Sequence, residues 1–146
     1  MKGEVIFKDV HHFPDITVLV PQQKSGKSLV VRNLMDDIPK DTEDPREGLK
    51  ELIHVIANIV VFEGDNPEPE TEFDPPIEFR VSYKDEYVEI AGGQLYDLVL
   101  AYRARDKWVI ISDPSYDYHI FPPSTARVAE VKIWSWIGDP VLAWGK

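Results

Sequence analysis

The segment FDPPIEFRVSY, from Phe73 to Tyr83, constrains the fold of this chain more than any other stretch. After its paired prolines, Ile77, Phe79, Val81 and Tyr83 alternate with polar residues. Successive side chains of a β-strand point to opposite faces, so this alternation predicts a half-buried antiparallel strand. Because a residue before proline avoids the helical region, we expect the strand to be entered through a rigid, extended loop.

Turn residues divide the rest of the chain into short segments of the same kind. Proline cannot donate a hydrogen bond to a β-ladder, and all twelve prolines fall between these segments. Ten short strands separated by turns are typical of sandwiches and barrels. We therefore predict an all-β fold, an antiparallel β-sandwich. The predicted strands are Gly3–Lys8, Ile16–Val20, Ser28–Leu34, His54–Phe62, Ile77–Tyr83, Tyr96–Arg103, Lys107–Ser112, Asp117–Phe121, Arg127–Trp136 and Val141–Trp144.

Two segments of this all-β pattern carry the signals of a short helix. Asp44 followed by Pro45 is a good helix start, so we expect one or two helical turns over Arg46–Leu52 and a strand after them. The β-branched residues that follow also favour a strand, and helix or strand stays open for residues 46–56. The second helix is predicted over Asp85–Ala91, because two glycines close it.

The composition limits the classes of function. The chain has 146 residues, enough for a single compact domain over residues 1–146, and it contains no cysteine, which excludes disulfides and thiolate metal sites. Its net charge of −10 opposes binding to nucleic acid. No apolar run approaches the roughly 20 residues of a membrane span, and the first residues lack the apolar stretch of a signal peptide. We expect a cytoplasmic protein without a membrane association, and its oligomeric state stays open.

Aromatic residues near the end of the chain are the candidate binding residues. In the predicted strand Arg127–Trp136, Trp134 and Trp136 share one face. Two interpretations stay open: both indoles lie in the core, or they form a platform for a peptide or a sugar ring. Tyr116 and Tyr118 alternate in the same way and extend that platform.

The motifs for chemistry are weak. The segment Ser25–Ser28 lacks the first glycine of a phosphate-binding loop and is interpreted as a turn. A small metal-dependent hydrolase would need His11, His12 or His119 to converge with acidic residues. No Gly-x-Ser-x-Gly elbow is present. We predict no catalytic residue, no metal ligand and no cofactor.

The order of elements from Phe73–Tyr83 onward resembles a known pair of modules. The strand is followed by Asp85-Glu86 and a short helix, and then by the segments Leu95–Leu98, Leu100–Tyr102 and Lys107–Val109. Over residues 53–144 this order resembles the junction of the ZU5 and UPA modules, the paired β-sandwiches of ankyrins, netrin receptors and death-domain proteins. The resemblance implies a possible division into a ZU5-like half, residues 1–83, and a UPA-like half, residues 84–146.

The resemblance also bears on chemistry and on function. Some relatives of these modules cleave themselves at a His-Phe-Ser type site, but here Ile133 and Trp134 precede Ser135, so we expect no self-cleavage. The main expectation is a non-enzymatic protein-interaction or regulatory module, acting in a larger assembly or signalling system. A carbohydrate-binding module is the first alternative and a metal-dependent hydrolase is the second.

Overall fold

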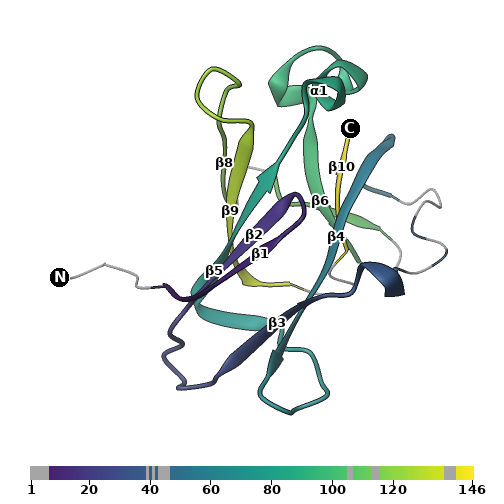
Figure 1. Ribbon diagram of the computed structural model, residues 1–146. Helices are drawn as coiled ribbons and strands as arrows, with labels where there is room; N and C mark the ends of the chain where they lie inside the picture. Colours follow the sequence, from purple (N-terminus) through teal and green to yellow (C-terminus); the bar gives the residue numbers. More distant parts are fainter. Residues whose placement is uncertain are drawn as a thin grey trace.

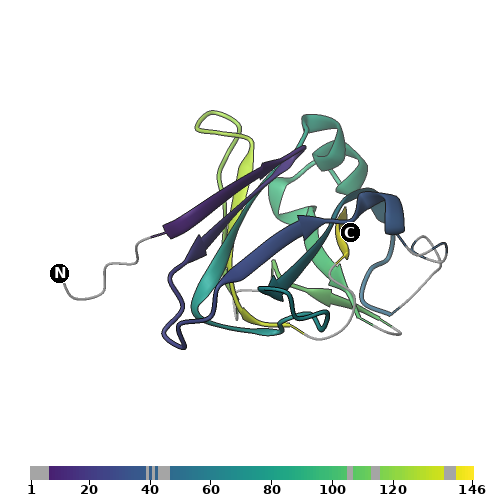
Figure 2. The same ribbon diagram turned by 60° about the horizontal axis from the view of Figure 1, so that its bottom comes forward.

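The computed structural model describes residues 7–38, 40, 42, 47–104, 107–112, 116–136 and 141–146, and it forms a β-sandwich of two antiparallel sheets (Figures 1 and 2). The first sheet contains, in spatial order, β1 (Phe7–Phe13), β2 (Ile16–Pro21), β5 (Glu72–Ser82), β9 (Val128–Ser135) and β8 (Asp117–Ile120). The second contains β3 (Leu29–Asn33), β4 (Leu52–Glu63), β10 (Val141–Gly145), β6 (Val99–Arg103) and β7 (Trp108–Ile110). The all-β sandwich prediction is therefore confirmed, and each sheet takes strands from both sides of residue 83.

The core lies between the two sheets. Ile77, Phe79 and Val81 of β5 are completely buried, as their alternation with polar residues predicts. From the second sheet, Leu142 and Trp144 of β10 belong to the same hydrophobic cluster. The central strand pairs β5–β9 and β4–β10 therefore bring the most apolar segments of the chain together, and burial of their side chains is the main stabilising contribution.

A bulge interrupts the pairing of β5 with β9. Ile77 is opposite Ile133 and Glu72 is opposite Ser135, so the four residues of β5 between Glu72 and Ile77 lie opposite the single residue Trp134 of β9. The paired prolines, Pro75 and Pro76, lie within this bulge, where the ladder does not require their backbone donors. The expectation that every proline falls between strands is wrong for these two, and for Pro21 at the end of β2.

The helix α1 (Asp85–Ala91) has the predicted bounds and caps the end of the sandwich at the top of Figure 1. Gly92 ends the helix with a φ of 147° and donates a hydrogen bond from its backbone to the carbonyl of Val88. Two 3-10 turns, η1 (Met35–Asp37) and η2 (Leu95–Asp97), were not predicted. Because η2 occupies its first residues, the strand predicted from Tyr96 begins only at Val99.

The predicted helical turns at Arg46–Leu52 are wrong for the residues that the structure describes, 47–52. The backbone here is recruited by neighbouring strands: the amide of Trp108 donates to the carbonyl of Glu47, and that of Lys50 donates to the carbonyl of Lys146. These bonds hold the segment across the outer face of the second sheet. It covers a small second hydrophobic cluster, Ala101, Trp108, Val141 and Ala143, with Leu49 packed against it.

The first strand also differs from its prediction. Gly3 and the three residues after it lie outside the described residues, and β1 runs from Phe7 to Phe13. The two neighbouring histidines, His11 and His12, are therefore strand residues. None of the described helices is long and apolar enough to cross a membrane.

Candidate functional site

The two candidate tryptophans of β9 have different environments. Trp134 is 56% exposed, whereas Trp136 is 5% exposed. The indole of Trp136 stacks on Phe79 with a ring-centre distance of 5.5 Å, and it also contacts Phe73 and Tyr102. Trp136 is therefore a core residue, and Trp134 is the exposed aromatic residue of this strand.

The prediction that both indoles share one face is wrong because the strand ends between them. The alternation of β9 holds through Ile133, which is buried, and Trp134, which is exposed. Ser135, the last strand residue, is exposed as well, and the chain then turns inward. The backbone amide of Trp136 donates to the carbonyl of Thr71, which holds its side chain toward the core.

The two candidate tyrosines do not extend a platform beside Trp134. Tyr118 of β8 pairs with the buried Val131 of β9, so its side chain lies on the core-facing side of the sheet. Tyr116 and Tyr118 both pack against the main core. The hydroxyl of Tyr118 is buried without a hydrogen-bond partner among the described residues, and this burial raises the pKa of the phenol.

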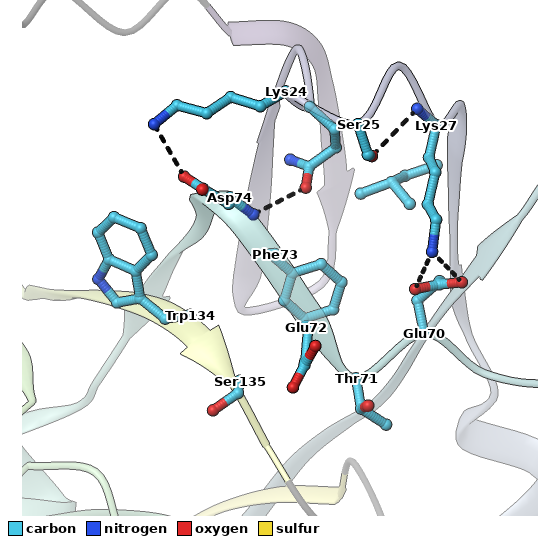
Figure 3. Close-up of a pocket in the computed structure, with 12 residues that line it drawn as sticks. Lys24, Ser25, Lys27, Glu70, Thr71, Glu72, Phe73, Asp74, Trp134 and Ser135 are labelled. Atoms are coloured by element: carbon cyan, nitrogen blue, oxygen red, sulfur yellow. Dashed lines mark hydrogen bonds and ion pairs between the residues drawn. The ribbon is translucent and has the colours of Figure 1, made fainter.

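Trp134 borders a hollow of about 410 Å³ at the end of the sandwich opposite α1 (Figures 1 and 3). Three segments far apart in the sequence form it: the loop between β2 and β3, the first residues of β5, and the end of β9. Figure 3 shows the Trp134 indole at one side of the hollow. The side chains of Glu72, Asp74 and Ser135 lie at other points of its lining. A volume of this size is in the range of small-molecule and side-chain pockets.

A buried glutamine fixes one wall of the hollow. The side-chain amide of Gln23 donates to the carbonyl of Pro21 at 3.3 Å and to that of Pro75 at 3.1 Å, and its oxygen accepts from the amide of Asp74 at 3.0 Å. The amide of Lys24 also donates to the carbonyl of Asp74. These bonds tie the β2–β3 loop to the bulge of β5, so the hollow is formed before any ligand arrives.

The charged side chains of the hollow are nearly balanced. Lys24 lies 3.4 Å from the carboxylate of Asp74, and Lys27 lies 3.3 Å from that of Glu70. The two lysines lie on either side of Ser25 and Gly26, where the chain turns and the amide of Gly26 donates to the carbonyl of Gln23. Glu72 has no ion pair among the described residues. Three carboxylates and two ammonium groups give the hollow one excess negative charge.

The histidines of the hydrolase alternative do not converge. His11 and His12 lie on β1, and His119 lies on β8, at the opposite edge of the first sheet. His11 and His12 point to opposite faces, as neighbouring strand residues must. No group of three histidine, aspartate or glutamate side chains with the spacing of a metal site is present in the part of the chain that the structure describes.

Comparisons with known proteins do not assign the chain to a class. No family model, no curated protein and no solved structure matches the chain. The chain is an all-β sandwich with a preformed hollow beside one exposed tryptophan.

The exposure of Trp134 has a direct spectroscopic test. The other three tryptophans, Trp108, Trp136 and Trp144, are buried, so acrylamide is expected to quench one part of the emission readily and the rest poorly. Trp134→Phe is expected to remove the readily quenched part. Uniform quenching in the wild-type protein, or an unchanged quenching curve in the variant, would contradict this placement.

Proposed function

We propose that the protein is a non-enzymatic interaction module that binds a protein partner through the surface around Trp134. The observation that carries this proposal is a tryptophan that is 56% exposed at the edge of a preformed hollow. Tryptophan is the residue type most enriched among the side chains that dominate protein-binding energy. An exposed indole contributes little to the stability of the fold. Its removal from water by a bound partner would therefore contribute favourably to the free energy of binding.

The surroundings of the indole support a protein interface. The ion pairs Lys24–Asp74 and Lys27–Glu70 lie at the rim of the hollow, and the Lys24–Asp74 pair is largely exposed. Aromatic side chains and a polar, charged rim are typical of interfaces between proteins. Exposed ion pairs contribute little to the stability of the fold. Their side chains can therefore form ion pairs with a bound protein instead, at a small cost in free energy.

The remaining parts of the proposal follow from charge and from resemblance. The acidic surface favours protein partners over nucleic acid. The ZU5/UPA-like order of elements agrees with a role in a larger assembly or signalling system, and we place this role in the cytoplasm. The proposal does not depend on a catalytic group.

The proposal is tested by affinity capture from the native source. The wild-type protein is expected to retain at least one protein that Trp134→Ala loses, because removal of a central tryptophan costs about 2 kcal/mol or more, roughly thirtyfold in affinity. Tyr96→Ala is the matched control, since Tyr96 is 81% exposed and lies in η2, outside the hollow. Capture of the same proteins in the same amounts by wild type and Trp134→Ala would contradict the proposed function.

A further inference from the structure

The hollow that Trp134 borders also contains a carboxylate, Glu72, that has no ion pair among the described residues. Glu72 is opposite Ser135 in the ladder between β5 and β9, and Ser135 directly follows Trp134 in the chain. Both side chains line the hollow (Figure 3). Each lysine of the hollow already has a carboxylate within 3.4 Å. The group that would complete this arrangement is therefore a cation that also has a flat face.

We propose that the partner inserts an arginine side chain into this hollow, with its guanidinium plane against the Trp134 indole and its donors on the Glu72 carboxylate. This inference rests on the proposed function and specifies the chemistry of the partner. Guanidinium stacks on tryptophan through a cation–π contact and binds a carboxylate through two parallel hydrogen bonds. The hollow presents both acceptors for these interactions from two neighbouring strands.

A second carboxylate strengthens the match with a guanidinium. Asp74 belongs to the same hollow, and its ion pair with Lys24 is largely exposed, so an entering cation can share the carboxylate at little cost. Arginine has five donors in a fixed plane and can bind a carboxylate while its flat face stacks, whereas lysine offers a compact charge without a flat face. The net charge of −10 on the chain also attracts a basic partner over a distance.

Other ligands fit the hollow less well. An anion would meet three carboxylates and two lysines that are already paired. A neutral sugar ring would stack on the indole, but it would leave the excess charge of the hollow uncompensated. The carbohydrate alternative therefore becomes an outcome that the experiment can detect.

The test uses the full chain and small probes. N-acetylarginine amide is titrated into isotope-labelled protein, and the shifts of the Trp134 indole N–H and of the Glu72 and Ser135 amides are followed by NMR. These shifts are expected to saturate. N-acetylcitrulline amide has the same planar shape without the charge. Its affinity is expected to be lower than that of the arginine probe by a factor of about ten or more, because a charge-assisted pair is lost. Lysine amide acetylated on its α-amino group keeps the charged side chain, and its affinity is expected to lie between those of the arginine and citrulline probes.

Two variants locate the carboxylate. Glu72→Gln keeps the size of the side chain and is expected to weaken the arginine probe about tenfold. Glu89→Gln is the matched control, because Glu89 is exposed on α1, away from the hollow, and it is expected to change nothing. Equal weakening by both variants would show general charge attraction and overturn the assignment.

The outcomes separate this inference from the proposed function. Equal binding of citrulline, or saturable shifts with methyl glucoside and none with arginine, would overturn the guanidinium site even if Trp134→Ala abolishes partner capture. Conversely, specific arginine binding without any partner lost by Trp134→Ala would leave the guanidinium site in place and remove the protein-interaction role.

Discussion

Replacing Trp136 with alanine is expected to lower the free energy of unfolding by about 3–5 kcal/mol, the usual cost of removing a large buried aromatic side chain. The indole fills the space between Phe79 of one sheet and Tyr102 of the other, and Phe73 packs against its edge. Its removal therefore opens a cavity that joins both layers of the sandwich. Urea or guanidinium unfolding, followed by circular dichroism, measures the change.

Trp134→Ala is the matched control, because it removes the same side chain two residues earlier on an exposed position. Its free energy of unfolding is expected to stay within about 0.5 kcal/mol of the wild-type value. If both variants were destabilised by the same amount, Trp134 would be a core residue and the proposed binding surface would lose its basis. Trp136→Phe separates the contribution of volume from a complete failure to fold, since it retains part of the packing.

Gly48→Ala is expected to destabilise the protein by at least about 2 kcal/mol, since it combines a left-handed backbone with a steric overlap. Gly48 has a φ of 111°, and a methyl group there would overlap the carbonyl oxygen of Trp108. The neighbouring carbonyl of Glu47 accepts from the amide of that same tryptophan. The substitution is therefore expected to lift residues 47–50 from the second cluster and expose Trp108, which unfolding and tryptophan fluorescence detect.

Gly26→Ala distinguishes the two causes. Gly26 also has a positive φ, 79°, but a methyl group there would meet no heavy atom within 4 Å. Its cost is expected to be about 1 kcal/mol, that of the backbone conformation alone. Equal losses for the two variants would show that the close approach of Gly48 to β7 contributes nothing.

Most of the secondary structure was predictable from the sequence, because the faces of a strand and the end of a helix at glycine are determined by neighbouring residues. The burial of Ile77 and its alternate neighbours follows from the period of the strand, and the end of α1 follows from Gly92. The predictions are wrong where tertiary contacts determine the backbone conformation. Residues 47–52 have a good helix start before them, yet the amide of Trp108 and the carbonyl of Lys146 recruit their backbone into other hydrogen bonds.

The candidate site was only partly predictable for the same reason. Trp134 stood out in the sequence, but the inward turn of Trp136 depends on the end of β9 and on the hydrogen bond that its backbone amide donates to the carbonyl of Thr71 in another segment. The spacing of Glu70, Glu72 and Asp74 at every second residue was an available signal, since it is the period of a strand face rather than of a solvated loop. Nothing local indicated that Gln23 joins two segments 52 residues apart.

The different environments of the two indoles also affect how this protein can change over generations. Trp136 packs in the core, so its replacement is expected to cost stability, whereas position 134 is exposed and is expected to accept many side chains at small cost. The loop between β2 and β3 supplies further variable positions at the same hollow, with Gln23 fixing the frame beneath them. Under the proposed function, substitutions at this end of the sandwich would change the partner without changing the fold, and the same positions would serve for selecting new binding specificities.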